Sequence, residues 1–387
     1  MDITGGRVLL ADGSEAVAAL RIEDGIIAAI DAGGVGGRRF DAAGLHVLPG
    51  IVDLHGDAFE RQLQPRPGVD FPVPLALRDT EAQLLANGIT TAMHAITLSW
   101  EPGLRSPERW RQVVDALAAA RPSMVCDMRV HMRWEMHNLP ALEMALDDIE
   151  AGRVGLVSFN DHTPSIRRKL ADPGQAEKYS ARAGMGVAAF AALAEQAAAH
   201  APGVDAGTRR LADAARRQGL AMASHDDATV AERERFRGLG ARICEFPMSE
   251  DVGIAARAAG DAVVMGCPNV VRGGSHLGWA SAAALAERDI CTVLCSDYYY
   301  PAMLPAAWAL SERLTLGRAW GLISQNPAAA AGLTDRGTIA VGQRADLVLV
   351  DPLGPQSGPP VGPRVVATIA GGEIAFINGA AGRLIYG

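Results

Sequence analysis

Short apolar runs alternate with alanine-rich stretches through the middle of the chain. Strands that alternate with helices form a parallel sheet, because each helix returns the chain to the edge where the next strand starts. We expect helices at 107–120, 139–151, 187–200, 208–218 and 279–288. The predicted core strands are Ile51–Asp57, Thr90–Ile96, Met124–Arg133, Val154–Asp161, Leu220–His225, Arg242–Phe246, Ala262–Gly266 and Thr292–Asp297.

Eight such units favour a closed (β/α)8 TIM barrel, with an open doubly wound sheet as the alternative. No Gly-x-Gly-x-x-Gly or Walker-type loop follows the first strand, which counts against the alternative. The barrel is expected to span residues 50–334.

Both chain ends show a different pattern, with short β-type runs separated by turn residues. Near the start the runs are divided by Asp12-Gly13 and Asp24-Gly25, which are hairpin signals. Near the other end they include Thr338-Ile339 and residues 345–350, 365–370 and 374–378. Neither end has enough strands for a stable sheet, so residues 1–49 and 335–387 are predicted to pair into one small β-sandwich.

Composition narrows the function further. The 387 residues have a formal net charge of −8 and no basic stripe, which argues against a nucleic-acid partner. All five cysteines lie in or beside apolar runs, where reduced thiols are the common state, so a cytoplasmic location is expected. The first residues resemble no secretory signal, and no apolar run reaches about 18 residues, so no membrane association is expected. A homo-oligomer stays open.

Polar side chains capable of metal binding or proton transfer occur where most of the predicted strands end. The first strand ends in His55 and Asp57, whose i, i+2 spacing places both on one side of an extended strand. Carboxyl ends of barrel strands converge at one mouth, so these residues are expected to meet there. The candidate metal ligands are His55, Asp57, Glu135, His162, His225 and Asp297.

Six imidazole and carboxylate ligands exceed what one catalytic zinc needs, since such zinc takes about three protein ligands. A pair of divalent ions fits better: zinc first, with manganese or iron as alternatives. A water bridging two ions about 3.5 to 4 Å apart becomes hydroxide near neutral pH. Glu135 is the candidate bridge, with His131 and His137 as substitutes, and Asp297 is the candidate catalytic acid/base.

These residues resemble the amidohydrolase superfamily, whose members carry His-x-His or His-x-Asp on the first strand and an aspartate on the eighth. The closing segment 337–348 is similar as well. More narrowly, Leu54-His55-Gly56-Asp57, Asn160-Asp161-His162-Thr163-Pro164, Ser224-His225-Asp226-Asp227 and Cys295-Ser296-Asp297-Tyr298-Tyr299 resemble the PhnM family of phosphonate metabolism. One departure is that the superfamily's middle histidines usually follow strands five and six, whereas His162 and His225 follow predicted strands four and five.

The resemblance implies hydrolysis of α-D-ribose 1-methylphosphonate 5-triphosphate, a phosphorylated sugar, with release of diphosphate. It also implies that the metal ligands are His55, Asp57, His162, His225 and Asp297. The family motifs support Glu135 as a ligand less directly. Of Asp226 and Asp227, one carboxylate would orient His225 rather than bind metal. The alternative is an amidohydrolase or deaminase acting on a C–N bond of a small cyclic substrate, because fold and metal residues do not separate these reactions.

Cations near the predicted mouth are candidates for substrate binding. The chain has only two lysines, Lys169 and Lys178, and both follow His162 together with three arginines. Such a charge run is typically a solvated surface, but here it adjoins the predicted metal site. Arg61, Arg272 and His276 are further candidates for contacting phosphate.

Overall fold

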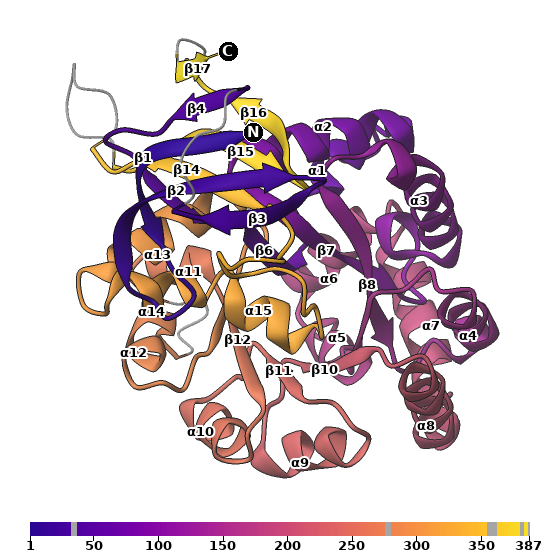
Figure 1. Ribbon diagram of the computed structural model, residues 1–387. Coiled ribbons are helices and arrows are strands. Elements are labelled where there is room, and N and C mark those ends of the chain that lie inside the picture. The colour runs from indigo at the N-terminus through magenta and orange to yellow at the C-terminus, as the bar shows by residue number, and fades with distance from the viewer. Residues whose placement is uncertain (32–36, 275–279, 354–361, 380–382, 386–387) are drawn as a thin grey trace.

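Two β-sheets organise the chain, an eight-stranded parallel sheet in the middle of the sequence and a nine-stranded sheet from its two ends (Figure 1). The computed structural model describes residues 1–31, 37–274, 280–353, 362–379 and 383–385. The predicted fold, a (β/α)8 barrel with a small β-sandwich formed by both ends, is confirmed.

The barrel strands pair in parallel and in chain order. They are β6 (Ile51–Gly56), β7 (Ile89–Leu98), β8 (Asp127–Glu135), β9 (Leu156–Asn160), β10 (Ala221–His225), β11 (Ile243–Glu245), β12 (Ala262–Gly266) and β13 (Val293–Cys295). Every residue of β7 is buried, because its two faces meet the barrel interior and the surrounding helices. The eight predicted strands are all present, so His162 and His225 do follow the fourth and fifth strands.

The barrel closes where β6 meets the segment after β13. The Asp57 amide donates to the Asp297 carbonyl and the Asp297 amide donates to the His55 carbonyl, each at 2.9 Å. Below this bridge, Asp53 accepts hydrogen bonds from the Ser296 amide at 2.9 Å and from the Ser296 hydroxyl at 2.6 Å. The closure therefore fixes the backbone of three predicted site residues.

Helices surround the barrel (Figure 1). They are α1 (Glu60–Leu63), α2 (Val73–Ala86), α3 (Pro107–Ala120), α4 (Leu142–Glu150), α5 (Thr163–Lys169), α6 (Pro173–Arg182), α7 (Val187–Ala198), α8 (Ala201–Arg217), α9 (Val230–Gly238), α10 (Glu250–Ala258), α11 (Cys267–Val271), α12 (Ala282–Glu287), α13 (Met303–Ser311), α14 (Leu316–Gly321) and α15 (Gln325–Ala330). Short 3-10 turns lie at η1 (Gly103–Arg105), η2 (Arg121–Ser123), η3 (Leu139–Ala141) and η4 (Tyr300–Ala302).

Local sequence signals explain several helix boundaries. Helix α3 has the predicted bounds because Ser106 caps it, accepting from the Arg109 amide. Helix α8 starts at Ala201, before the predicted Thr208, with Pro202 in its first turn, where proline is favoured. No helix within the described ranges is both long and apolar enough to cross a membrane.

The sheet from the chain ends joins strands far apart in sequence. It comprises β1 (Asp2–Leu9), β2 (Glu15–Glu23), β3 (Ile26–Ile30), β4 (Arg39–Asp41), β5 (His46–Pro49), β14 (Leu347–Asp351), β15 (Arg364–Ala370), β16 (Glu373–Ile377) and β17 (Leu384–Ile385). Strand β5 pairs with β14, which joins the two ends as predicted. The predicted strand at Thr338-Ile339 is wrong: Ile339 is buried, but the segment lies between the turn residues Gly337 and Gly342 and pairs with no strand.

A cluster of charged residues lies at the barrel end opposite the mouth, where β8 begins. The Asp127 carboxylate accepts hydrogen bonds from Arg121, Arg129 and Arg336 at 2.7 to 3.1 Å. Arg336, which comes from the segment before β14, also donates to the Thr91 hydroxyl at 2.8 Å. This basal ion cluster (Arg121, Asp127, Arg129, Arg336) links the returning chain to the barrel.

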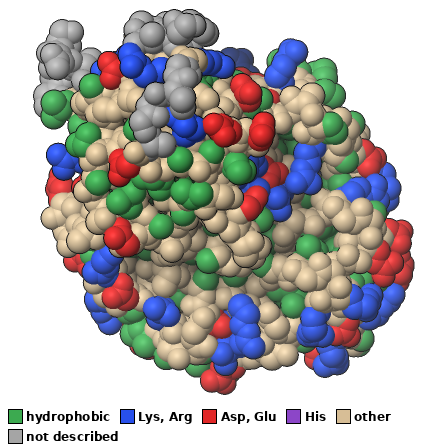
Figure 2. Space-filling view, viewed as in Figure 1, with side chains coloured by type: hydrophobic (Ala, Val, Ile, Leu, Met, Phe, Trp, Pro, Cys, Tyr) green, Lys and Arg blue, Asp and Glu red, His purple; other side chains and the backbone are tan. Residues whose placement is uncertain are grey.

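The five cysteines are all buried and unpaired, as expected for reduced thiols. On the face shown in Figure 2, basic and acidic side chains are interspersed rather than gathered into a basic stripe.

Candidate active site

Two histidines and one buried glutamate form the centre of the barrel mouth. Glu245, the last residue of β11, places Oε2 3.2 Å from His55 Nδ1 and 3.2 Å from His225 Nδ1. Its other oxygen, Oε1, has no hydrogen-bond partner among the described residues and lies 3.8 Å from His131 Nε2. Sequence reasoning missed Glu245, although it ends a strand just as the predicted ligands do.

A second group adjoins the first through His225. Asp226 lies 3.6 Å from His225 Nε2 and 3.5 Å from His162 Nε2. Its backbone has φ +59°, a left-handed conformation that turns the side chain into the mouth. Asp227 faces the other way, accepting from the Ser224 hydroxyl at 2.5 Å, so Asp226 is the carboxylate of the pair that meets the histidines.

Glu135 lies beside these groups but is bound to the chain that follows β9. Its carboxylate accepts hydrogen bonds from the His162 amide, the Thr163 amide and the Thr163 hydroxyl at 2.7 to 3.2 Å. His162 Nδ1 lies 3.6 Å from the same carboxylate. The contacts visible here hold the start of α5 in place, and the bridging role of Glu135 stays a prediction.

The two alternatives to Glu135 have separate positions. His131 faces Glu245 and bonds through Nδ1 to the Leu54 carbonyl at 3.0 Å. His137 bonds to the Ala197 carbonyl at 3.2 Å and faces Asp161. Of the two, His131 therefore adjoins the group at the centre of the mouth.

Burial and neighbouring carboxylates raise the pKa values of three carboxyl groups in the mouth. Burial, together with the charge of Asp57, raises the pKa of Asp297 to about 7. Burial also raises the pKa of Glu245 to about 7, and burial with the Glu60 charge raises that of Asp57 to about 6. Protons are therefore exchangeable near neutral pH at three carboxyls of this mouth.

The histidines respond in the opposite direction. Burial, followed by the charge of Arg133, holds the pKa of His55 and that of His225 well below the usual range. Both imidazoles are therefore neutral at pH 7, which is the state that binds metal.

The donor set fits divalent metal ions. Two groups have ligand atoms within 4.8 Å of one another: His55, His225 and Glu245, and His162, His225 and Asp226. Imidazole with carboxylate suits zinc, and also manganese or iron. Glu245 Oε1 and His131 Nε2, both buried without a hydrogen-bond partner in the described part of the chain, are the kind of atoms that a metal would satisfy. Asp57 and Asp297 line the same cavity as His55 and His225.

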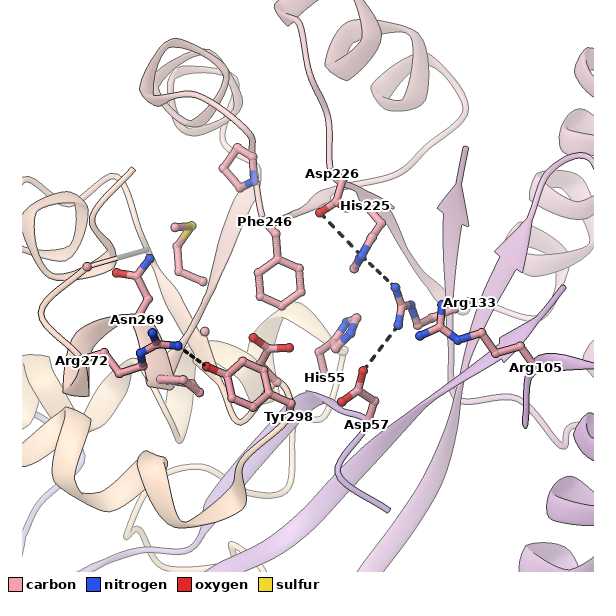
Figure 3. A pocket seen from close by; sticks show the side chains of 16 residues that line it. His55, Asp57, Arg105, Arg133, His225, Asp226, Phe246, Asn269, Arg272 and Tyr298 are labelled. Carbon is pink, nitrogen blue, oxygen red and sulfur yellow. Dashed lines mark hydrogen bonds and ion pairs between the residues drawn. The ribbon is translucent and has the colours of Figure 1, made fainter. Parts of the chain in front are cut away.

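The mouth opens into a cavity of about 230 Å³, shown in Figure 3. On one side it is lined by His55, Asp57, Arg105, Arg133 and His225, and on the other by Phe246, Asn269, Arg272 and Tyr298. Asn269 bonds to backbone at residues 280 and 282, whereas Arg272 faces Tyr298, with 3.4 Å between the guanidinium and the phenol oxygen.

A second cavity, of about 150 Å³, adjoins the first and shares Arg105 and Asp226 with it. We call it the α5–α6 cavity, because Ser165, Ile166, Lys169, Tyr179 and Arg182 of those helices line it, along with Glu101 and His162. Lys169 and Arg182 also line an outer groove with Lys178. The predicted cationic segment therefore leads from the surface to the histidine cluster.

The predicted substrate residues have different positions. Lys169 and Lys178 are exposed beside these cavities, and Arg272 lines the mouth itself. Arg61 is exposed and lines neither the mouth cavity nor the α5–α6 cavity. The predicted contact at His276 lies outside the described residues. Which of these bind substrate stays a prediction.

Comparison with known proteins agrees with this geometry. The model of an amidohydrolase family matches residues 76–376. The α-D-ribose 1-methylphosphonate 5-triphosphate diphosphatase of Escherichia coli (strain K12) is 35% identical over 317 residues, which cover 80% of this chain and 84% of the relative.

Solved structures show the same fold at low identity. The 5-methylcytosine deaminase of Klebsiella pneumoniae, liganded with phosphonocytosine, superposes with a TM-score of 0.63 at 17% identity, covering 98% of both chains. The N-acetylglucosamine-6-phosphate deacetylase of Pasteurella multocida gives a TM-score of 0.64 at 13% identity, covering 97% of this chain and 99% of that one. At such identities the likeness establishes the architecture alone.

Proposed function

The chain belongs to the amidohydrolase family, and from this premise we propose that it is a metal-dependent diphosphatase. Its substrate would be α-D-ribose 1-methylphosphonate 5-triphosphate, and its products α-D-ribose 1-methylphosphonate 5-phosphate and diphosphate. The relative at 35% identity supports this reaction over others of the family. Two divalent ions, with zinc as the first choice, would be held by His55, Asp57, His162, His225 and Asp297, with Glu135, Glu245 and Asp226 as further candidates.

The observation that carries the proposal is the junction of the mouth with the α5–α6 cavity. A triphosphate has several negative charges, and the α5–α6 cavity offers it the cations of Lys169, Arg182 and Arg105. A neutral cyclic substrate of an amidohydrolase would not require them. Arg182 pairs with Glu101 and its guanidinium lies 5.0 Å from the Tyr179 ring, so this cation is held in place before substrate binds.

Bound metal ions would activate water and polarise the phosphoryl oxygen. The water oxygen forms a bond to the α-phosphorus while the bond from that phosphorus to the α–β bridging oxygen breaks. Asp297, which lines the same cavity as the predicted metal ligands, takes the proton of the water and passes it to the departing diphosphate. The cations of α5 and α6 hold the β- and γ-phosphates in this arrangement.

Product analysis tests the proposal. Purified protein is supplied with zinc or manganese and with a panel comprising the ribosyl triphosphate, a nucleoside triphosphate and cyclic amides. Diphosphate release from the first compound is expected. Orthophosphate as the sole product, or ammonia from a cyclic substrate without any diphosphate release, contradicts the proposal.

The lysines provide a second test. Replacing Lys169 and Lys178 together by alanine should raise KM for the triphosphate roughly tenfold or more, because a charge-assisted contact to phosphate contributes about 1.5–3 kcal/mol. The defect should shrink as salt rises, since salt weakens the same contacts in the parent protein. Arg168→Ala is the matched control, because Arg168 is exposed on the same helix and lines neither cavity. Unchanged kinetics at low salt would leave this segment a solvated surface.

A further inference from the structure

Arg133 is a buried cation that points into the active-site mouth. It lies on β8 between His131 and Glu135, and residues two apart on a strand share a face. Both neighbours face the barrel interior, and Arg133 follows them, with its side chain only 6% exposed. Figure 3 shows the guanidinium between Asp57 and His225, at the edge of the cavity.

The guanidinium has few partners there. One terminal nitrogen lies 2.9 Å from His225 Nε2, and the other lies 3.8 Å from an Asp57 oxygen, beyond hydrogen-bond distance. Its Nε has no hydrogen-bond partner among the described residues. A buried charge with unused N–H donors is costly, and proteins satisfy such donors with a carboxylate, with water or with a ligand.

Arg233, another buried arginine of this barrel, shows what a structural arginine looks like here. It is 1% exposed, and its terminal nitrogens donate to the Ser224 hydroxyl and to the backbone carbonyls of Ala241 and Ile243. Asp227 and Asp261 each lie 3.4 Å from its guanidinium. Arg233 Nε also lacks a hydrogen bond among the described residues, but it lies 3.4 Å from an Asp261 oxygen, so acceptors of the protein itself surround Arg233. Arg133, by contrast, lines the cavity, and its ion-pair partner Asp57 lies 3.8 Å away.

We propose that Arg133 is a catalytic residue whose guanidinium donates hydrogen bonds to the non-bridging oxygens of the phosphoryl group under attack. This inference rests on the proposed function and adds the group that distinguishes a phosphoryl centre from a neutral carbonyl or amidine. A planar guanidinium matches two phosphoryl oxygens at once, and its fixed charge stabilises the transition state of phosphoryl transfer. Arg105, which lines the same cavity, pairs loosely with Glu60 and Glu101, at 3.9 Å each, and lies on the way to the α5–α6 cavity.

Arg133→Ala and Arg133→Lys test the assignment, each assayed with metal content and thermal unfolding measured on the same sample. We expect kcat for diphosphate release to fall at least a hundredfold in Arg133→Ala, with KM changed less and metal content retained. The lysine variant should be intermediate, because it restores charge without the two-pronged geometry. Added guanidinium chloride, at concentrations that do not unfold the protein, should raise kcat of Arg133→Ala at least fivefold relative to sodium chloride of equal ionic strength.

Arg129→Ala is the matched control, since Arg129 belongs to the same strand but to the basal ion cluster. It should show no guanidinium response. A kcat of Arg133→Ala within threefold of the parent overturns the inference, and so does a loss of activity that follows metal loss and shows no rescue.

Phosphate binding separates this inference from the proposed function. Inorganic orthophosphate is titrated into the zinc-loaded parent and into Arg133→Ala by calorimetry. If the parent releases no diphosphate from any compound but binds phosphate at least tenfold more tightly than the variant, the proposed reaction fails, while the contact of Arg133 with phosphoryl oxygens stands. If the parent releases diphosphate while the variant binds phosphate and turns over equally well, the reaction stands and the role of Arg133 is overturned. Absence of phosphate binding and of turnover in the parent overturns both.

Discussion

The two ends of the barrel use the same kinds of charged residue in opposite ways. At the base, burial of Asp127 is outweighed by the hydrogen bond from Arg129 and by the charges of Arg129, Arg336 and Arg121, so its pKa lies well below the usual range. At the mouth, burial and neighbouring carboxylates raise the pKa of Asp297 to about 7. Both are aspartates beside barrel strands, and their surroundings alone set them apart.

The charged residues at the base stabilise the fold, whereas those at the mouth are arranged for chemistry. Charges at the base neutralise one another, which fixes the returning chain against the barrel. Charges at the mouth are left with like-charged neighbours, neutral histidines and unfilled hydrogen bonds, an arrangement that a bound metal or substrate would relieve. The strained backbones of Asp226 and Asp297, with φ of +59° and +55°, also lie at the mouth.

Removing a mouth histidine should produce the largest effect. His225→Ala and His55→Ala should lose metal and lower diphosphate release about a thousandfold or more, because bound metal supplies several kcal/mol of transition-state stabilisation. Elemental analysis, activity and circular dichroism are measured together, and the fold should persist. His46→Ala is the control, since His46 pairs with Glu15 in the sheet of the chain ends. Full metal retention in both mouth variants would contradict the assignment of His55 and His225 as metal ligands.

Asp297→Asn should lower turnover roughly a hundredfold or more while much of the metal stays bound, because the amide cannot accept the proton. Asparagine tolerates the left-handed backbone of this position, so the fold should survive. Asp289→Asn is the control, at another aspartate with positive φ that pairs with Arg318 on the surface. Turnover close to that of the parent would reduce Asp297 to a structural role.

Breaking the basal ion cluster should lower stability and leave turnover nearly unchanged, the opposite of the mouth variants. Asp127→Asn should lower the free energy of unfolding by about 2–3 kcal/mol, because it leaves the buried Arg336 without the Asp127 carboxylate. Diphosphate release per folded molecule should change less than twofold. Denaturant unfolding and steady-state kinetics measure the two quantities, and a loss of turnover without a loss of stability would contradict the division between the two ends.

The smallest predicted effect is a pH dependence of the metal-free protein. The folded-state pKa of Asp297, about 7, lies above its unfolded value of 3.8, so ionising it opposes folding and stability falls as pH rises between those values. Asp297→Asn removes that loss. Relative to the parent, the variant should gain about 2 kcal/mol, or a few degrees in Tm, at pH 8 compared with pH 5. Equal differences at both pH values would mean that the carboxyl titrates normally.

Much of the fold was predictable because periodicity reports burial. All eight barrel strands follow from apolar runs, and the pairing of the two ends follows from the small number of strands at each end. The segment after His162 was less predictable: its charges suggested a surface loop, but Ile166 and Ala176 are buried and the chain forms α5 and α6.

The candidate site was predictable where it rests on strand ends. Glu245 satisfies that rule, but the predicted strand ran on to Phe246 and so placed Glu245 inside the strand rather than at its end. Arg133 was not predicted, because the candidate cations all lie in segments that follow the strands, whereas Arg133 lies within β8. Its spacing from His131 and Glu135 places it on their face. The contacts of Glu135 with residues 162 and 163 depend on how one loop packs, which no local pattern in the sequence encodes.

A metal titration tests most directly the claim that the mouth is an active site built around metal ions. Chelator-treated protein is titrated with zinc, and bound metal per chain is measured alongside diphosphate release from the ribosyl triphosphate. We expect turnover to be absent without metal, to rise with occupancy and to reach its maximum at two ions per chain, with a parallel rise in Tm. Full turnover in the metal-free protein, or no zinc bound at micromolar free zinc, would contradict this claim.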